Sequence, residues 1–190
     1  MQLVTPAPGY LAAYTDALRR GWSPDNARGA AAAAEQLEAI ERDAQAFVAG
    51  LTDREALGAP IRLPDGSTVP RLPGFVMWMW DGEFCGSIGM RWQRGTEALP
   101  PYCLGHIGYG VVPWKRERGY AKAALAQMLV HAKAEGLRWV DITTDLENRA
   151  SQRVILANGG VLLEQFEKPS QYAGSHVGLR YRVELTPACA

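Results

Sequence analysis

A cluster of basic residues around one glycine lies where strand-forming residues give way to a helix, in the stretch "WKRERGYAKAAL" at positions 114–125. Four basic side chains fall within this stretch: Lys115, Arg116, Arg118 and Lys122. The start of a helix presents unpaired backbone N–H groups and the positive end of the helix dipole, which together favour an anion. Gly119 lacks the Cβ atom that would hold an anion away from the backbone, and Ala121 is nearly as small. The pattern predicts a phosphate site, and a solvated basic surface is the alternative.

Two familiar phosphate-binding motifs do not explain this stretch. The P-loop pattern, GxxxxGK followed by Ser or Thr, does not occur in the sequence. Gly105, Gly108 and Gly110 have the spacing GxxGxG, which is the reverse of the dinucleotide fingerprint, and they lie inside a predicted strand instead of opening a helix. A phosphate site in this chain therefore depends on the turn around Gly119.

The first 57 residues predict two amphipathic helices, followed by a connector rich in Pro and Gly at 58–74. In the first helix, apolar side chains recur every four residues: Tyr10, Tyr14 and Leu18. The second helical stretch runs from about Pro24 to Val48. Ser23 is its predicted N-cap, with Pro24 at the first helical position.

From Gly74 onward the pattern is that of strands with two interspersed helices. Strands are predicted at 75–80, 85–92, 103–112, 137–145, 161–168 and 176–185. Helices are predicted at 118–135 and 147–160, ended by Gly136 and by Asn158-Gly159-Gly160. The order predicts a mixed α/β (α+β) domain: a mostly antiparallel sheet flanked by helices, with a helical N-terminal section. The strand-helix-strand unit at 103–145 predicts a central parallel strand pair.

Length and composition limit the class of protein. A chain of 190 residues suits one domain, and 20 basic against 20 acidic residues leave no excess positive charge for a nucleic-acid or membrane-surface binder. No apolar run approaches the length of a membrane span, and no secretory signal is visible. The cysteines show no CxxC spacing, so no disulfide framework or zinc site is predicted and a reducing cytoplasm fits best.

Three stretches together resemble the GNAT superfamily of N-acetyltransferases, and most closely a poorly characterised branch of predicted acetyltransferases with a helical N-terminal section. "VVPWKRERGYAKAAL" is similar to the acetyl-CoA signature, Gln/Arg-x-x-Gly-x-Gly/Ala, which here is Arg116-Glu117-Arg118-Gly119-Tyr120-Ala121. "DITTDLENRASQRVILANGGVL" is similar to the next characteristic block, and "GHIGYGVVP" resembles the preceding strand. The resemblance covers about residues 74–165 in the expected order.

The resemblance implies a binding mode for the acetyl donor, acetyl-CoA, and implies no metal. Backbone N–H groups of residues 116–121 would hold the coenzyme diphosphate. The end of the strand at Val111 and Val112 would pair its backbone with the pantetheine arm. Asn148 would orient that arm further along.

Acetyl transfer to an amine also needs proton transfer. His106 is the predicted general base, because a histidine pKa of about 6.5 suits the task and the resemblance puts this residue beside the thioester, where relatives often carry a glutamate. The alternative is that His106 only fills a groove or bonds a nearby carbonyl. A backbone N–H near Val112 is the predicted oxyanion donor.

The second proton transfer goes to the sulfur of the departing thiolate. Many relatives protonate it with a tyrosine at the position that is Ile155 here. Ser151 is the predicted substitute, with helix capping as its alternative role. The three cysteines are predicted to be packing or terminal residues and not nucleophiles: Cys85, Cys103 and Cys189.

The acceptor is predicted only as a primary amine of a small metabolite or peptide. Aromatic residues are predicted either to line its pocket or to fill the core: Trp78, Trp80, Trp92 and Tyr102. Asp81 and Glu97 would either attract a cationic amine or face water. Residues 1–190 are predicted to form a single acetyltransferase domain, in which 1–73 shapes the acceptor site, 74–165 binds the coenzyme and 166–190 adds the last strands. The sequence leaves open whether the protein forms a homodimer. The alternative function is a non-catalytic acyl-CoA sensor, which the isoleucine at position 155 favours.

Overall fold

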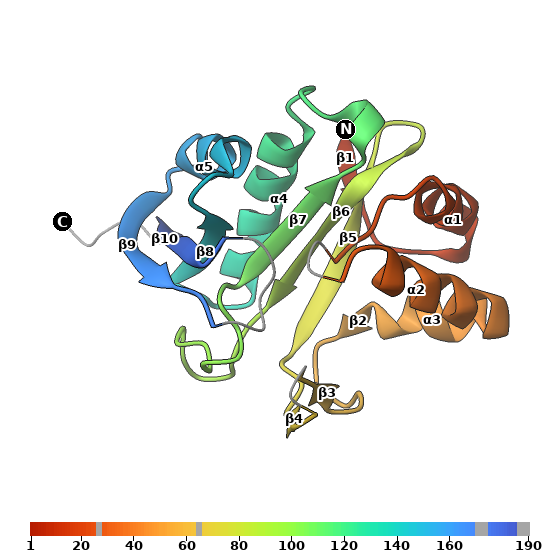
Figure 1. Ribbon diagram of the computed structural model, residues 1–190, viewed down its shortest axis with the longest axis horizontal. Helices are drawn as coiled ribbons and strands as arrows, with labels where there is room; N and C mark the ends of the chain where they lie inside the picture. Colours follow the sequence, from red (N-terminus) through yellow and green to blue (C-terminus); the bar gives the residue numbers. More distant parts are fainter. Residues whose placement is uncertain (26–27, 64–65, 170–174, 186–190) are drawn as a thin grey trace.

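Antiparallel strands in separate sheets carry the fold of this computed structural model, which describes residues 1–25, 28–63, 66–169 and 175–185 (Figure 1). The larger sheet has the order β1 (Gln2–Val4), β5 (Gly74–Trp80), β6 (Phe84–Arg91) and β7 (Ile107–Val111), and β2 (Thr52–Asp53) also pairs with β5. The smaller sheet has the order β8 (Trp139–Asp145), β10 (Val177–Glu184) and β9 (Val161–Glu167). A short hairpin joins β3 (Ile61–Arg62) to β4 (Thr68–Val69).

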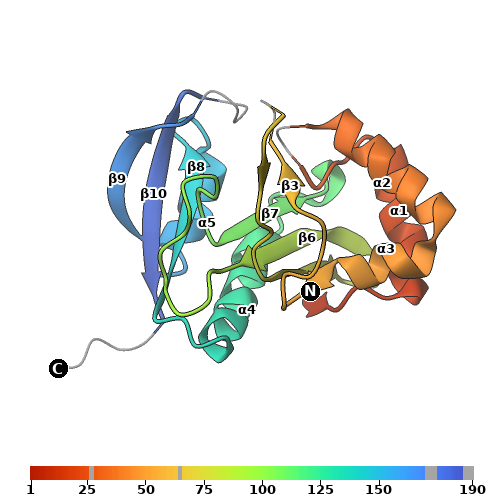
Figure 2. The same cartoon turned by 90° about the horizontal axis from the view of Figure 1, so that it is seen from below.

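Helices cover both faces of the larger sheet. One face packs against α1 (Leu11–Arg19), α2 (Ala30–Arg42) and α3 (Ala44–Gly50), preceded by the short helix η1 (Pro8–Tyr10). The other face packs against α4 (Tyr120–Ala134), which follows η2 (Pro113–Lys115) and contacts α5 (Arg149–Leu156). Figure 2 shows α1 to α3 and the smaller sheet at opposite ends of the molecule, with β6 and β7 between them. The mixed α/β fold predicted from the sequence is confirmed.

Strand β5 is apolar on both faces because each face is covered. Met77 and Met79 point into the core beneath α4, whereas Trp78 points toward α1 and is stacked on Tyr14 with ring centroids 4.6 Å apart. The predicted turn to β6 is present, and Gly82 adopts φ +109°, a conformation that favours glycine. The predicted hairpin is confirmed.

Glycines in left-handed conformations bound α4 at both ends. Gly119 is its N-cap, with φ +77°, and Gly136 follows its last turn with φ +86°. Between them, the sequence pattern predicts a buried face of Leu125, Met128, Leu129 and Ala132. The structure buries Leu125, Met128 and Ala132 together with Ala124, whereas Leu129 is half-buried. The predicted Asn-Gly-Gly end of α5 is also confirmed, with Gly159 at φ +81°.

The N-terminal section differs from the prediction at β1, at Asp43 and at Ser23, and the short strands β2, β3 and β4 were not predicted either. The three-residue strand β1 was missed, because so short a segment carries no periodicity. The second helical stretch is broken at Asp43, whose carboxylate caps α3 by accepting bonds from the N–H groups of Gln45 and Ala46. Ser23 is not the cap of α2, which begins at Ala30; its hydroxyl accepts a bond from the N–H of Asp25 at 3.2 Å.

The strands on either side of α4 meet at one point instead of forming the predicted parallel ladder. The N–H of His106 donates to the carbonyl of Asp141 at 2.7 Å, just before β7 begins. The N–H of Asp141 donates to Nδ1 of His106 at 2.9 Å, so a side chain occupies a main-chain donor that a ladder would use. Beyond this contact β7 pairs with β6 and β8 pairs with β10. One edge of β7 is therefore left without a strand partner among the described residues.

Candidate active site

The chain enters α4 through a turn whose backbone is open to solvent. Glu117 and Gly119 both adopt positive φ angles, +63° and +77°. Among the described residues no side chain caps this end of α4, so its first-turn N–H groups have no side-chain acceptor there. An ideal Cβ atom on Gly119 would meet no atom within 4 Å. The turn therefore has the free donors and the space that an anion needs.

Charge around the turn is unevenly distributed. Arg116, Arg118 and Lys122 are exposed near its mouth, and Nε of Arg116 donates to the carbonyl of Val111 at 3.3 Å. Lys115, which the sequence grouped with these residues, is buried and forms ion pairs with Asp81 at 2.7 Å and Glu83 at 3.0 Å. Lys115 is thus neutralised inside the protein, and the available positive charge comes from the other three residues.

Asp81, in the turn between β5 and β6, connects the sheet to the turn that precedes α4. Its carboxylate accepts bonds from Nζ of Lys115 and, at 2.5 Å, from the hydroxyl of Tyr120. These bonds hold the pKa of Asp81 well below its usual range, Lys115 contributing most. Neither of the two acidic residues predicted to attract a cationic amine is free, because Glu97 is paired with Arg138 at 2.7 Å.

The two valines at the end of β7 have different main-chain roles. The N–H of Val112 donates to the carbonyl of Cys85 at 2.9 Å, so it faces β6 and is not available as the predicted oxyanion donor. Main-chain groups alternate between the two sides of a strand, so those of Tyr109 and Val111 face the unpaired edge. This edge leads toward the open turn at the start of α4.

At the start of α5, two polar side chains from different elements meet. Asn148 caps α5 through its Oδ1, which accepts a bond from the N–H of Ser151 at 3.0 Å. The hydroxyls of Ser151 and Tyr109 lie 2.9 Å apart. Burial raises the pKa of Tyr109 to about 12, although the bond to Ser151 lowers it. Ile155, at the usual tyrosine position, is fully buried in the core.

Tyr109 was not singled out from the sequence. A tyrosine acid was sought only on the helix, at position 155. The signal was the alternation of β7, in which Tyr109 shares a face with the buried Ile107 and so points toward the side of the sheet that carries α4 and α5.

His106 lies in an unexpected environment for a base. Its side chain is 0% exposed, and Nδ1 accepts the N–H of Asp141. The hydrogen of the neutral ring therefore sits on Nε2, which has no hydrogen-bond partner among the described residues. Burial lowers the pKa of His106, so the ring stays neutral. The structure gives no support to the prediction that His106 removes a proton from the acceptor.

The remaining candidate residues divide between core and surface. Trp78 and Trp92 are buried in the core, and Trp92 also lines a cavity at the C-terminal end of α4. Cys85 is buried, its thiol donates to the carbonyl of Glu83, and burial raises its pKa to about 11. Cys189 lies outside the described residues. Among the described residues no group of three His, Cys, Asp or Glu side chains is placed to hold a metal ion, and no helix is long and apolar enough to cross a bilayer.

Comparison with known proteins identifies the family. The Acetyltransferase (GNAT) domain matches residues 37–161, about two thirds of the chain, so the protein belongs to the GNAT acetyltransferase family. It is accordingly an N-acetyltransferase whose acetyl donor is acetyl-CoA. No curated protein matches the chain.

Solved structures of acetyltransferases share the fold at low sequence identity. The microcin C7 self-immunity acetyltransferase MccE, solved with acetyl-CoA and AMP, is 12% identical with a TM-score of 0.61, over 96% of this chain and 91% of its own. The Salmonella typhimurium enzyme that modifies the N-terminal serine of ribosomal protein L7/L12 is 14% identical with a TM-score of 0.58, over 96% and 93%. Mycobacterium smegmatis RimJ, with CoA-disulfide, is 19% identical with a TM-score of 0.57, over 96% and 80%. At these identities the likeness shows the fold alone.

Proposed function

We propose that the protein transfers the acetyl group of acetyl-CoA to a primary amine, of a small metabolite or a peptide, by direct attack of the amine on the thioester. The observation that carries the proposal is the open turn at residues 116–121, which lies between the unpaired edge of β7 and the start of α4. Acetyl-CoA supplies an activated acetyl group, so no enzyme nucleophile is needed.

The residues of the turn fit the coenzyme diphosphate. Within the turn at 116–121, the N–H groups of residues 117–121 would bind it, since the N–H of Arg116 donates to the carbonyl of Pro113 at 3.4 Å. The side chains of Arg116 and Arg118 would supply positive charge at the mouth. The edge of β7 at Tyr109 and Val111 would bond the pantetheine amides as an added strand does. Val112 would contribute through packing, since its N–H is already paired with Cys85.

Ser151 and Tyr109 would together supply a proton for the departing sulfur. Their hydroxyls are within hydrogen-bond distance, and Tyr109 stays protonated at neutral pH because burial raises its pKa to about 12. A thiol pKa of about 8.5 makes the thiolate a tolerable leaving group, so their contribution to the rate is expected to be moderate. Asn148 would act mainly by fixing the start of α5 beside this pair.

His106 would act as a positioning residue. Its two contacts with Asp141 join the start of β7 to β8, and beyond this contact the two strands diverge. Loss of the amine proton would then fall to water, and the rate would follow the neutral fraction of the acceptor amine. A base with the lowered pKa of His106 would instead give a bend at or below pH of about 6.5.

The N-terminal section, residues 1–73, would shape the acceptor side of the same domain, because α1 to α3 cover the face of the sheet opposite α4. A peptide acceptor is supported by the Salmonella typhimurium relative that modifies a ribosomal protein N-terminus. The unpaired thiols of Cys85 and Cys103 fit a reducing cytoplasm.

The alternative is an acyl-CoA sensor that has kept the turn and lost the chemistry, which the replacement of the usual tyrosine by Ile155 favours. Thiol release from acetyl-CoA, followed with a chromogenic reagent across a panel of amines, distinguishes the two. An enzyme is expected to release thiol from acetyl-CoA in the presence of one class of amine, at a rate that rises with the concentration of that amine. Tight coenzyme binding without thiol release on any amine or peptide would contradict the proposal and favour the sensor.

A further inference from the structure

A groove of about 570 Å³ lies on the face of the larger sheet that carries the N-terminal helices. Its floor is bare main chain, because Gly89 of β6 stands directly opposite Gly108 of β7. The groove continues to Gly105 and Thr143, where β7 and β8 separate. It thus reaches the strand edge assigned above to the coenzyme arm, from the side opposite α4.

Arg91 brings a positive charge to this groove. It is the last residue of β6 and shares a face with Gly89, so its side chain leans over the glycine floor. An ideal Cβ atom on Gly108 would lie 3.4 Å from the Nη2 atom of Arg91. Within the part of the chain that the structure describes, the guanidinium of Arg91 makes no hydrogen bond or ion pair.

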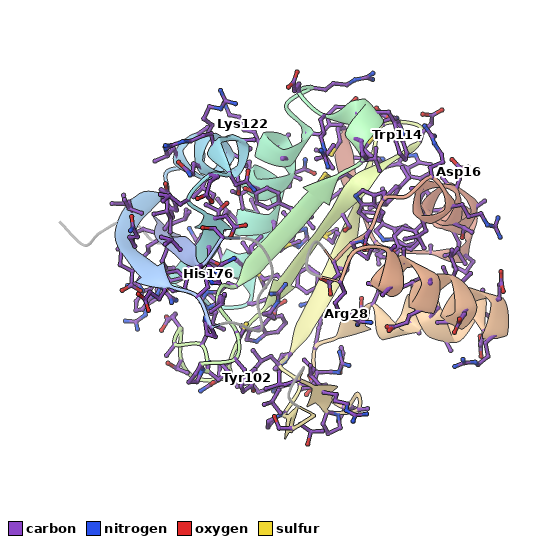
Figure 3. All side chains as sticks on the ribbon, viewed as in Figure 1. Asp16, Arg28, Tyr102, Trp114, Lys122 and His176 are labelled. Atoms are coloured by element: carbon purple, nitrogen blue, oxygen red, sulfur yellow. The ribbon has the colours of Figure 1, made fainter. Side chains whose placement is uncertain are left out.

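The other charged side chains of the groove offset each other. The carboxylate of Asp53 accepts bonds from the N–H groups of Leu57 and Gly58 at 2.9 Å each and lies 3.9 Å from Arg71. The remaining walls include apolar side chains such as Leu51 and Val76, and Tyr102, labelled in Figure 3, bonds the carbonyl of Pro70. Arg91 is therefore the uncompensated charge among the described lining residues.

A second cavity, of about 610 Å³, shows the contrast. It lies at the C-terminal end of α4, and its arginines are paired with glutamates: Arg54 with Glu135, Arg94 with Glu55, and Arg138 with Glu97. Because these arginines are already paired, the cavity has no free positive charge among its described lining residues. It also lies at the end of α4 opposite the turn assigned to the coenzyme.

We propose that the groove binds the acceptor, and that the acceptor amine carries an anionic group, a carboxylate or a phosphate, which pairs with Arg91. This inference rests on the proposed function and names its substrate class. A planar guanidinium binds a carboxylate or phosphate through two parallel hydrogen bonds, and a partly enclosed site strengthens them. An anion held over Gly108 leaves the amine end of the same molecule to extend toward the separated ends of β7 and β8.

Matched pairs of amines test the proposal. One arm compares ω-amino carboxylates with their carboxamides, and the other compares aminoalkyl phosphates with the corresponding amino alcohols. Two readouts are taken: thiol release from acetyl-CoA, and calorimetric binding of each amine to the protein saturated with desulfo-CoA. The anionic member of at least one pair is expected to bind and react at least about tenfold better than its neutral partner, in line with a charge-assisted hydrogen bond.

Variants link the preference to the arginine. Arg91→Gln should abolish the preference, and Arg91→Lys should keep part of it. Gly108→Ala should weaken it without changing charge, because the new methyl group, 3.4 Å from Nη2 of Arg91, would occupy the space over position 108 in which the anion is held. Arg19→Gln, on the exposed surface of α1, is the matched control and should retain it.

Equal or tighter binding of the neutral partners in both arms, or an anionic preference that survives in Arg91→Gln, would overturn the proposal. Such a result would leave coenzyme binding intact. Failure of the protein to bind desulfo-CoA at all would instead count against the proposed function.

Discussion

At the scale of single residues, the structure places a tyrosine hydroxyl beside the serine that the sequence predicts as the proton donor. The sequence pointed to Ser151 because the usual tyrosine position is Ile155, but it gave no sign that a tyrosine hydroxyl would reach Ser151 from another element. Tyr109 comes from β7, 42 positions earlier in the chain. A tyrosine hydroxyl is therefore present beside Ser151, although position 155 of the helix is an isoleucine.

The Tyr109 and Ser151 pair predicts a specific pattern of mutant kinetics. Tyr109→Phe keeps the ring in the core and removes only the hydroxyl, and Ser151→Ala removes the other partner. Each is expected to lower kcat by about tenfold, with the KM for acetyl-CoA nearly unchanged, because a proton donor acts in the transition state. The double variant should be no slower than the slower single one, since groups that act as a unit are not additive. Additive losses, or an unchanged kcat in Tyr109→Phe, would count against the pair.

At the scale of elements, the turn that opens α4 is held by a hairpin distant in sequence. Asp81 bonds both Lys115 of η2 and Tyr120 in the first turn of α4. Sequence patterns located the hairpin and the helix correctly, but the link between them depends on how β5, β6 and α4 pack. For the same reason Lys115 was wrongly grouped with the phosphate-binding charges.

Asp81→Asn should loosen this link. The expected cost is about 2 kcal/mol of unfolding free energy, since Lys115 is buried and would lose one of its two carboxylate partners. Coenzyme affinity should fall as well, because the first turn of α4 is no longer fixed. Glu83→Gln is the matched control: Glu83 also contacts Lys115, but its side chain is 77% exposed, so its loss should change stability little.

The same link has a defined pH dependence. Because the pKa of Asp81 is lowered in the folded protein, its contribution is fully present above the unfolded pKa of about 3.9 and is lost as pH falls below that value. Urea unfolding of the wild type and Asp81→Asn should therefore differ most near pH 7, and the difference should shrink steadily as pH falls below about 3.9. A difference that grows on acidification would be inconsistent with this assignment.

At the scale of the whole molecule, local patterns were predictable and the separation of the sheets was not. Strands β5 and β6 and helix α4 follow from hydrophobic periodicity and turn glycines, which act locally. The open edge of β7 arises because β8 pairs with β10 and because His106 occupies the N–H of Asp141, and both are long-range choices. The groove beside Arg91 likewise depends on the register that sets Gly89 opposite Gly108. The coenzyme-binding residues themselves stay a prediction.

The most direct measurement compares the two ends of α4. Gly119 and Gly136 both have positive φ angles and open space around the missing Cβ atom, so a valine should strain the backbone similarly at either position. Calorimetry of coenzyme A binding is expected to show a Kd raised by about tenfold or more in Gly119→Val and unchanged in Gly136→Val. Only the valine at position 119 would occupy the space assigned to the coenzyme diphosphate. Wild-type affinity in Gly119→Val, or an equal loss in both variants, would contradict the assignment of the diphosphate to the N-terminal turn of α4.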